Sequence, residues 1–470
     1  MFIKQLFTSC ISEYAYYLES KGEAVVIDPL RDVDEYINLA KERKATIKYI
    51  FETHFHADFV SGHLDLAKAT GATIVYGPDT RTKFKVHVAK DGETFSVGDV
   101  TISLLHTPGH TLESSCYLLN NEAGKSHAIF TGDTLFIGDV GRPDLSQNEL
   151  FSMDDLAGMM YKSIQSKILP LEDDVLVYPG HGAGSSCGKN LGKESFSTIG
   201  EQKKHNYALQ EQTKEEFIKA ITEGLVAPPK YFPINAMINK EGYENLSSII
   251  ETGLTKLSVE TFKTKMREDE YVVLDTRAAK VFVEGFIPGA ISVGLEGRFA
   301  EWAASLLPFD KTILLVTDAD KEEETIIRLA RVGFEKMGGY LEGGFEAWKN
   351  AGEQIDLVID VDVDELAMDI EFDNNLVVLD VRKEAEFDNG HLKEALNIPL
   401  ENLLDPGTMA DFDDNHNIYV HCGGGYRSVI GCSLLKRQGI HNIRNVNGGW
   451  DAITELKDKF KIIKTEASLN

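Results

Sequence analysis

Short apolar runs alternate with amphipathic stretches through the first half of the chain. Seven of these runs are rich in β-branched and aromatic residues and end in a turn signal, which is typical of strands. They cover residues 24–29, 47–52, 73–77, 100–107, 115–119, 127–133 and 175–181. Apolar positions three and four residues apart predict helices over residues 32–44 and 153–168. This mixture of strands and helices predicts an α/β fold made of layers.

The chemically active side chains of this half gather behind the predicted strands. Five of them come directly after an apolar run: His54, His56, His110, Asp133 and His181. Loops at strand ends are where α/β proteins build their sites. These side chains are therefore expected to meet at one edge of the fold.

The second half of the chain repeats itself. The stretch YVVLDTRAAKVFVEGFIPGAISV, which contains Asp275, is matched by LVVLDVRKEAEFDNGHLKEALNIPL, which contains Asp380. LEGGFEAW, with Gly343, is matched by VNGGWDAI, with Gly448, and both offsets are 105 residues. Two copies are too few for a solenoid, so the pattern predicts a tandem duplication of a small domain.

Three domains follow from these patterns, since 470 residues are too many for one ordinary core. A segment rich in proline, residues 225–246, is expected to be irregular and to pack as a tail before a boundary near residue 250. The predicted domains are a large one at residues 1–250 and two repeat copies at residues 251–356 and 357–470.

Composition narrows the class of protein. The formal net charge is −27, so neither nucleic acid nor an anionic membrane is expected as a partner. No apolar run is long enough to span a bilayer, and the N-terminal stretch lacks the features of a secretory leader. The five cysteines are widely spaced without a CxxC pair, which favours free thiols in a reducing cytoplasm. A homo-oligomer is allowed, but nothing in the sequence marks an interface.

Four motifs in a fixed order point to a bound metal. They are THFHAD with His54, His56 and Asp58, TPGHT with His110, TGDT with Asp133, and YPGHG with His181. An HxH pair alone is a weak signal, but each motif here follows a predicted strand and is flanked by Gly or Pro, which allow a sharp turn. Imidazole and carboxylate ligands suit zinc, iron or manganese.

This set resembles the metallo-β-lactamase superfamily, whose fold is an αββα sandwich with the site at the strand ends. In its dinuclear hydrolases, one metal takes the positions that match His54, His56 and His110. The other metal takes those that match Asp58, the next residue and His181, with Asp133 bridging. Here the next residue is Phe59, which cannot bind a metal. The resemblance therefore implies that a second metal has lost one ligand.

Within the superfamily, the chain most resembles the persulfide dioxygenases, which bind one Fe(II) per chain. The matching ligands are His54, His110 and Asp133. Two histidines and one carboxylate leave coordination positions open for O₂ and a substrate sulfur. Three residues would support these ligands by hydrogen bonds or serve as alternative ligands: His56, Asp58 and His181. Zinc is the alternative to iron at this site.

Three further residues of this half allow two interpretations each. Arg142 could bind an anionic substrate or pin a loop through Asp144. Cys187, six residues after His181, could touch a sulfur intermediate or be an inert buried thiol. Phe59 could form a wall of the site or pack in the core.

A second reactive centre is expected in the motif YVHCGGGYRS of the last domain. A predicted strand ends before Cys422, which opens a glycine-rich turn that leads into a helix. Backbone N–H groups of such a turn and the N-terminus of the helix form a cradle for an anion, and they favour the nucleophilic thiolate. Arg427 adds a positive charge. The residues expected to line the cradle are Gly423, Gly424, Gly425 and Tyr426.

This loop resembles that of the rhodanese family of sulfurtransferases, as do LDVR at Asp380 and GHLKEALNIP at His391. Four residues separate Cys422 from Arg427, one fewer than in tyrosine phosphatases, and the smaller ring suits sulfur better than phosphate. The resemblance implies an α/β domain with a parallel sheet in which Cys422 carries sulfane sulfur as a persulfide.

The preceding copy is expected to be inactive. Its equivalent stretch is LLVTDADKEEET, in which Asp318 aligns with the cysteine and Glu323 with the arginine. Neither a nucleophile nor a cation is left, and the acidic run would repel anionic sulfur species.

The two centres together imply a persulfide dioxygenase fused to an inactive and an active rhodanese domain. Such an enzyme oxidises a low-molecular-weight thiol persulfide with O₂ to sulfite, and its active rhodanese domain makes or uses thiosulfate, in sulfide detoxification. Two alternatives stay open: a thioester hydrolase of the glyoxalase II type, which needs two metals, and a non-catalytic persulfide carrier. The identity of the thiol and the direction of sulfur transfer also stay open.

Overall fold

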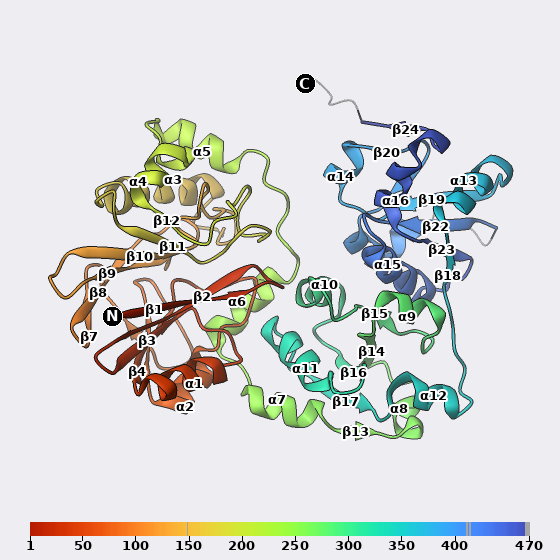
Figure 1. Cartoon of the computed structure of the whole chain (residues 1–470), viewed down its shortest axis with the longest axis horizontal. Helices are drawn as coiled ribbons and strands as arrows, with labels where there is room; N and C mark the ends of the chain where they lie inside the picture. Colours follow the sequence, from red (N-terminus) through yellow and green to blue (C-terminus); the bar gives the residue numbers. More distant parts are fainter. Residues whose placement is uncertain (148, 410–411, 413–414, 466–470) are drawn as a thin grey trace. The chain divides into compact units, whose positions relative to one another are not determined.

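The structure is a computed structural model that describes residues 1–147, 149–409, 412 and 415–465 (Figure 1). Contacts between residues divide the chain into two units. The first contains residues 1–248 and 327–335, and the second contains residues 249–326 and 336–470. The division into three domains stays a prediction, and residues 466–470 of the last predicted domain lie outside the described residues.

Two six-stranded sheets form the frame of the first unit. The first sheet has the order β1-β2-β3-β4-β5-β6 and is antiparallel up to β3 and parallel from β3 onward. Its strands are β1 (Phe2–Thr8), β2 (Glu13–Ser20), β3 (Glu23–Ile27), β4 (Thr46–Phe51), β5 (Thr73–Tyr76) and β6 (His87–Val88).

The second sheet has the order β12-β11-β10-β9-β8-β7, in which β10 and β11 are parallel and the other pairs are antiparallel. Its strands are β7 (Thr94–Val97), β8 (Val100–His106), β9 (Ser115–Asn120), β10 (Ser126–Gly132), β11 (Leu176–Pro179) and β12 (Ser197–Thr198).

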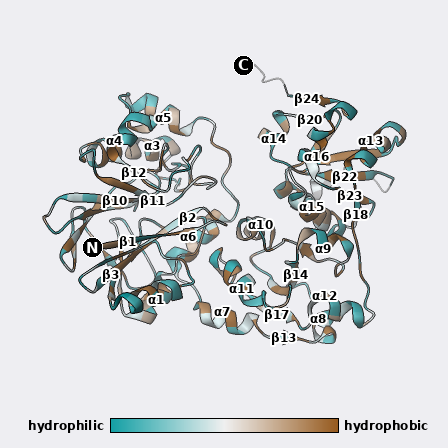
Figure 2. Ribbon diagram, viewed as in Figure 1, coloured by the Kyte–Doolittle hydropathy of each residue, from teal (hydrophilic) through white to brown (hydrophobic). Residues whose placement is uncertain are grey.

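The two sheets pack face to face around one apolar core. Leu18, Val25 and Phe51 of the first sheet belong to the same buried cluster as Leu104 and Phe130 of the second. Hydrophilic colouring dominates the visible side of α1 (Asp34–Arg43) in Figure 2, since this helix packs on the first sheet through buried residues such as Tyr36 and Ala40.

Helices cover the outer faces of the two sheets. Those that pack on the first sheet are α1 (Asp34–Arg43) and α2 (His63–Thr70), and those on the second are α3 (Met153–Ser163), α4 (Ile199–His205) and α5 (Lys214–Thr222). The chain then continues through α6 (Phe232–Glu241) and α7 (Leu246–Gly253). These layers form an αββα sandwich, so the predicted fold class is confirmed.

All seven predicted strands and both predicted helices of this half are present. The second helix continues beyond α3 as one π-helical turn, Ile164–Ile168. β2 escaped notice because all of its residues are buried, so no polar alternation marks it. The irregular tail expected at residues 225–246 is wrong in part, because it contains α6. Pro233 lies in the first turn of that helix, where a missing N–H breaks no intrahelical bond.

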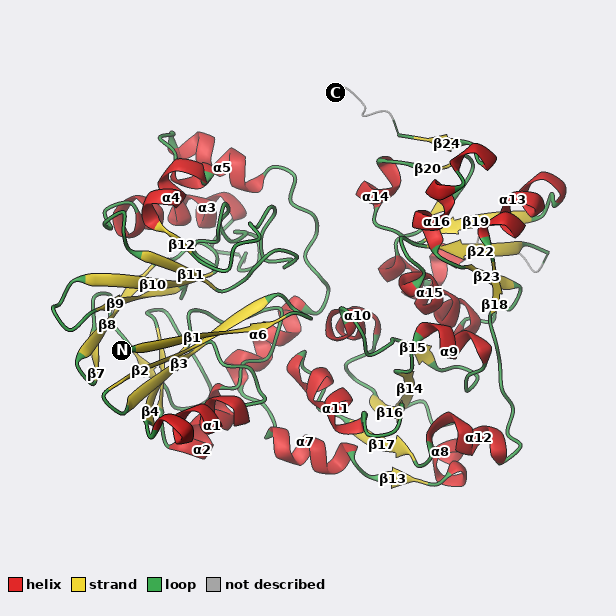
Figure 3. Ribbon diagram, viewed as in Figure 1, coloured by secondary structure: helices red, strands yellow, loops and turns green. Residues whose placement is uncertain are grey.

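Two five-stranded sheets, parallel throughout, form the second unit (Figure 3). The first has the order β13-β17-β16-β14-β15, and the second has the order β18-β23-β22-β19-β21. The strands of the first are β13 (Lys256–Leu257), β14 (Tyr271–Asp275), β15 (Ile291–Ser292), β16 (Thr312–Val316) and β17 (Met337–Leu341). Those of the second are β18 (Ile359–Val361), β19 (Leu376–Asp380), β21 (Leu396–Asn397), β22 (Asn417–His421) and β23 (Ile443–Val446).

Helices and one small sheet complete the two repeat copies, of which residues 327–335 in the first copy belong to the first unit. The helices of the first copy are α8 (Val259–Lys265), α9 (Ala279–Glu284), α10 (Phe299–Leu306), α11 (Glu322–Arg331) and α12 (Gly344–Asn350). Those of the second copy are α13 (Val363–Phe372), α14 (Glu384–Asp388), α15 (Tyr426–Arg437) and α16 (Gly449–Glu455). A two-stranded antiparallel sheet joins β20 (His391–Leu392) to β24 (Ile462–Ile463). In the described residues, no helix is both long enough and apolar enough to cross a membrane.

The sequence repeat is a repeat of one fold. Both large sheets place corresponding strands in the same order, and β14 and β19 begin 105 residues apart, as do β16 and β22. Each copy also holds the same buried ion pair after its first central strand. Asp275 pairs with Arg277 at 2.6 Å, and Asp380 pairs with Arg382 at 2.6 Å.

Truncating one core leucine should destabilise the first unit selectively, so that the two units unfold at different urea concentrations. Leu119 is fully buried between the two sheets, whereas Leu118 on the same strand is partly exposed toward the helices. We expect Leu119→Ala to lower the free energy of unfolding of the first unit by about 2–5 kcal/mol, and Leu118→Ala to lower it less. Urea unfolding followed by far-UV circular dichroism measures this effect.

Tryptophan fluorescence supplies the internal control. All three tryptophans belong to the second unit: Trp302, Trp348 and Trp450. The urea concentration at the midpoint of the tryptophan fluorescence transition should therefore be the same in both variants as in the wild type. Equal destabilisation by the two leucine substitutions would contradict a core that lies between the sheets.

Candidate metal centre and cysteine loop

Three loops of the first unit bring His54, His110 and Asp133 together. His54 follows β4, His110 follows β8 and Asp133 follows β10, so strand ends of both sheets contribute. The Nε2 atoms of the two histidines lie 3.8 Å and 3.4 Å from Asp133 Oδ2. One potential ligand atom from each residue lies within 4.8 Å of the other two, and all three side chains are buried. The residues predicted to bind a single metal are therefore adjacent.

Hydrogen bonds on the outer side of each histidine fix the nitrogen that faces this site. The Nδ1–H of His110 donates to the backbone carbonyl of Arg142 at 2.8 Å. The Nδ1–H of His54 donates to Thr53 Oγ1 at 3.0 Å, and burial lowers the pKa of His54 well below its ordinary value. A neutral imidazole with its proton on Nδ1 presents an unprotonated Nε2, which is the form that binds a metal.

Asp133 has the environment of a metal-binding carboxylate. Burial opposes its charge, but His181 and His54 hold the pKa of Asp133 far below its ordinary value. Its Oδ1 accepts a hydrogen bond from His181 Nδ1–H at 2.8 Å, whereas its Oδ2 is buried with no hydrogen-bond partner among the described residues. An unpaired charged oxygen is costly in the interior of a protein. A cation held by this oxygen and two imidazoles would remove that cost, so the residues fit iron or zinc.

A second group of potential ligands lies beside the first. Asp58, His181 and Cys187 are buried, and one ligand atom from each lies within 4.8 Å of the other two. His181 Nε2–H donates to Asp58 Oδ2 at 2.8 Å. Burial opposes the charge of this imidazole, but Asp133 and Asp58 raise the pKa of His181 well above its ordinary value. Burial, and then the charge of Asp58, raise the pKa of Cys187 well above its ordinary value.

His56 faces a different set of carboxylates. Its Nε2 lies 3.1 Å from Asp28 Oδ1 and 3.6 Å from Glu52 Oε2. The fully buried Phe59 ring packs on the His56 ring with 4.3 Å between their centroids, which favours the core-packing interpretation of Phe59. Neither carboxylate was predicted from the sequence to belong to the site. Asp28 directly follows β3, so the same strand-end signal could have found it.

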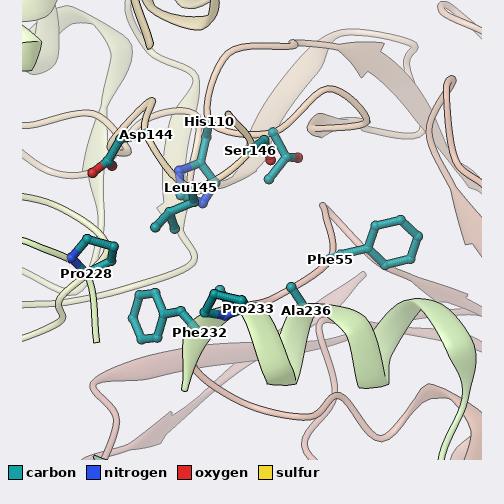
Figure 4. Close-up of a pocket in the computed structure, with 11 residues that line it drawn as sticks. Phe55, His110, Asp144, Leu145, Ser146, Pro228, Phe232, Pro233 and Ala236 are labelled. Carbon is teal, nitrogen blue, oxygen red and sulfur yellow. The ribbon is translucent and has the colours of Figure 1, made fainter. Parts of the chain in front are cut away.

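A pocket of about 140 Å³ opens beside His110 (Figure 4). Helix α6 contributes Phe232, Pro233 and Ala236 to its wall, and Asp144 lies on another side. The other lining residues are Phe55, Ala57, Thr111, Leu145, Ser146 and Pro228, so none of those named is a lysine or an arginine. The pocket can therefore hold an uncharged part of a ligand next to a candidate metal ligand.

The guanidinium of Arg142 is hydrogen-bonded to neighbouring residues. It forms a bidentate pair with Asp144, at 2.7 Å for each contact. It also donates to the backbone carbonyls of Ser186 at 3.2 Å and Val226 at 2.6 Å. These contacts tie three loops together. A role of Arg142 in substrate binding stays a prediction, and the contacts favour the loop-pinning interpretation.

Cys422 lies at the start of a tight loop between β22 and α15. The backbone at Gly425 has a φ of 99°, and its N–H donates to Cys422 Sγ at 3.2 Å. The Cys422 thiol faces Ser428 Oγ at 3.7 Å. Behind the loop, Trp450 N–H donates to the Cys422 carbonyl at 2.7 Å. A Cβ at Gly449 would lie 2.5 Å from that carbonyl oxygen, so only glycine fits there.

Arg427 is held by a carboxylate that the sequence analysis missed. Its two terminal nitrogens donate to the two carboxylate oxygens of Glu386 at 2.6 Å and 2.8 Å. This hydrogen-bonded pairing lowers the pKa of Glu386 and raises that of Arg427, so both groups are charged at neutral pH. The positive charge of Arg427 expected beside Cys422 is therefore already paired with Glu386. This pair could not be predicted from sequence spacing, because Glu386 lies on α14 and Arg427 on α15.

The preceding copy has neither a cysteine nor an arginine at the matching positions. The residue after β16 is Thr317, as the residue after β22 is Cys422. A Cβ at Gly344 would lie 3.1 Å from the Thr317 carbonyl oxygen, just as one at Gly449 would approach that of Cys422. The predicted match of Cys422 with Asp318 is wrong by one residue. The first copy has one more residue between β16 and α11 than the second copy has between β22 and α15. The sequence alignment placed this extra residue directly after β16, whereas it lies within the loop.

Comparison with known proteins assigns both halves of the chain. The Metallo-beta-lactamase superfamily matches residues 9–181, and the Rhodanese-like domain matches residues 258–351 and 362–456. A crystal structure of a metallo-beta-lactamase from Staphylococcus aureus subsp. aureus COL is 32% identical, with a TM-score of 0.63 over 73% of this chain and 98% of that chain. The chain belongs to the metallo-β-lactamase superfamily. Two rhodanese-like domains follow its metallo-β-lactamase domain.

Two other relatives carry different names. The crystal structure of ETHE1 from Myxococcus xanthus is 31% identical, with a TM-score of 0.44 over 51% of this chain and 98% of that chain. A probable hydroxyacylglutathione hydrolase of Schizosaccharomyces pombe is 32% identical over 174 residues, which are 36% of this chain. The chain spans 63% of the length of that hydrolase.

Removing one candidate ligand should release the metal. We expect His110→Ala to lower the affinity for iron by more than the 10–100-fold that loss of a supporting contact costs, because a ligand is lost outright. Chelator competition and elemental analysis of anaerobically prepared protein measure this change. His106→Ala is the matched control, since His106 ends the same strand and donates to the Leu112 carbonyl at 2.9 Å. Equal iron affinity in the two variants would contradict a ligand role for His110.

Proposed function

We propose that the chain is a persulfide dioxygenase joined to a sulfurtransferase. The observation that carries this proposal is the buried set of His54, His110 and Asp133, with Asp133 Oδ2 unpartnered among the described residues. Two histidines and one carboxylate form the ligand set of non-haem iron(II) oxygenases. The Cys422 loop in the same chain provides a carrier for the sulfur that such an enzyme handles.

The first centre converts RSSH, O₂ and water into RSH, sulfite and two protons. Iron bound by the three ligands supplies the redox chemistry that the reaction of O₂ with sulfur requires. The chain's own residues orient this ligand set: Thr53 fixes the His54 ring, and the Arg142 carbonyl fixes the His110 ring. The apolar pocket beside His110 binds the organic part of the persulfide and keeps bulk water from it.

The second centre moves sulfane sulfur through Cys422. In the forward direction, sulfite attacks the outer sulfur of the Cys422 persulfide, a new S–S bond forms, and the bond to Cys422 breaks. Thiosulfate leaves, and the electron pair of the broken bond stays on the Cys422 thiolate. The Gly425 N–H, 3.2 Å from Sγ, stabilises this leaving group by a hydrogen bond. Run in reverse, the same step takes sulfur from thiosulfate.

Oxygen consumption tests the first centre directly. Protein loaded anaerobically with iron is mixed with glutathione persulfide and, separately, with coenzyme A persulfide. We expect oxygen uptake with the appearance of sulfite or thiosulfate from at least one of them. No uptake with either persulfide, in protein that contains iron, would overturn the dioxygenase proposal.

Single substitutions should separate the two centres. Cys422→Ser removes the nucleophile, so sulfur transfer from thiosulfate to cyanide should fall by roughly 100-fold or more while oxygen uptake from added persulfide persists. His110→Ala should give the opposite result. If Cys422→Ser abolished both activities, the two centres would not be independent.

A dinuclear thioester hydrolase of the glyoxalase II type is the second candidate. The observation that favours it is the buried cluster of Asp58, His181 and Cys187 beside Asp133, which offers ligands for another metal. This candidate predicts about two metal ions per chain and hydrolysis of S-lactoylglutathione. About one iron per chain without that hydrolysis would exclude it. A pure sulfur carrier would show neither oxygen uptake nor hydrolysis while Cys422 still accepted sulfur.

A further inference from the structure

The two repeat copies of the second unit meet at the helix that follows Cys422. The hydroxyl of Tyr426, the first residue of α15, donates to the backbone carbonyl of Gly294 in the first copy at 2.7 Å. Farther along the same helix, the Ser433 hydroxyl accepts a hydrogen bond from the Ser292 N–H at 3.0 Å. The first copy is therefore hydrogen-bonded to the residue that directly follows the Cys422 loop as well as to the body of the helix.

The Gly294 carbonyl is fixed by the framework of the first copy. The residues on either side of Gly294 donate their N–H groups to the carbonyls of Asp275 and Thr276, both at 3.0 Å. Asp275 in turn forms a buried bidentate pair with Arg277, at 2.9 Å and 2.6 Å. A backbone carbonyl held on both sides of its residue offers a stationary acceptor.

This framework persists in a copy that lacks the reactive cysteine. The active copy has the equivalent ion pair, Asp380 with Arg382, near its own Cys422 loop. The first copy keeps its ion pair although Thr317 stands where the cysteine would be. In the first copy, the pair of Asp275 and Arg277 can therefore serve to fix the Gly294 carbonyl that accepts the hydrogen bond from Tyr426.

Glycine at position 294 allows the tyrosine ring to approach. A Cβ there would lie 3.3 Å from Tyr426 Cε2 and 3.3 Å from the Arg277 carbonyl oxygen. Both separations are shorter than ordinary van der Waals contact for such atoms. A Cβ at this position would therefore require the ring or the neighbouring turn to move by a few tenths of an ångström.

We propose that Tyr426 is a positioning residue through which the first copy holds the Cys422 loop in its sulfur-binding conformation, an inference that rests on the proposed sulfurtransferase function. Tyr426 directly follows Gly425, whose N–H donates to Cys422 Sγ. Restraining Tyr426 restrains the peptide group that faces the sulfur. The expectation from the sequence that Tyr426 binds substrate stays a prediction, and the role proposed here acts through the backbone of the loop. The inactive copy is thereby the scaffold of the active one.

Tyr426→Phe in the full chain tests this role because only the hydroxyl is removed. We expect the backbone amides of residues 422–427 to exchange with solvent deuterium about five- to tenfold faster, the change that loss of one hydrogen bond produces. The kcat for sulfur transfer from thiosulfate to cyanide should fall by a similar factor with little change in KM, because the loop is loosened while the substrate contacts persist.

Ser433→Ala is the matched control. It removes another hydrogen bond between the copies on the same helix, about two turns beyond Tyr426. We expect exchange in the loop and sulfur transfer to stay at the wild-type level. If this variant reproduced the effects of Tyr426→Phe, the effects would belong to the contact between copies in general, and the specific role of Tyr426 would be overturned.

Gly294→Ala approaches the same bond from the inactive copy. It should loosen the loop and slow transfer as Tyr426→Phe does, and the double variant should lose nothing further, because both changes remove one interaction. Unchanged loop exchange in Tyr426→Phe would overturn the proposal, and so would faster exchange with normal transfer. If the wild-type protein transferred no sulfur, the sulfurtransferase function would be refuted. The hydrogen–deuterium exchange of residues 422–427 would still show by itself whether the first copy holds the loop.

Discussion

The candidate metal centre depends on one constraint: Asp133 must stay ionised in a dry interior, at the place where two sheets end. A buried carboxylate is tolerated only when positive or hydrogen-donating groups surround it. His181 supplies one such group at 2.8 Å, and the two Nε2 atoms near Oδ2 face a position that a cation would fill. The rigid sandwich makes this possible, since loops from both sheets are held within a few ångströms of one carboxylate.

The same constraint explains the second layer of the site. Every ring that faces Asp133 is fixed from behind by a group that the sandwich positions, such as the Arg142 carbonyl behind His110. Arg142 is in turn pinned by Asp144 and by carbonyls of two distant loops. The geometry near the metal position is therefore set by residues that never reach it.

Much of the fold follows from local pattern. Each predicted strand or helix of the first half carried its own periodicity and a turn signal at its end, so neighbouring sequence was enough to find it. The repeat was equally visible, because Asp275 and Asp380 sit at one fixed offset. β2 and α6 did not follow, since a strand buried on both faces has no alternation and a proline-rich segment can still begin a helix.

The candidate ligands were predictable because each follows a strand, but their partners were not. Glu386 meets Arg427, and Asp28 meets His56, only through the way separate elements pack. The one-residue error at Thr317 has the same origin, because sequence alone cannot tell on which side of a loop an extra residue lies. Besides β2 and α6, the contacts between elements are what the sequence left unspecified.

The three glycines after Cys422 do not share one reason for being there. Gly425 requires its positive φ, which disfavours any side chain. A Cβ at Gly423 would meet only the flexible end of Arg427 at 3.2 Å, and one at Gly424 would lie 3.5 Å from Asp451 Oδ2. Side chains at these two positions would approach Arg427 and Asp451 without straining the backbone of the loop. Related chains can therefore vary at positions 423 and 424 while the turn at Gly425, which faces the sulfur, stays the same.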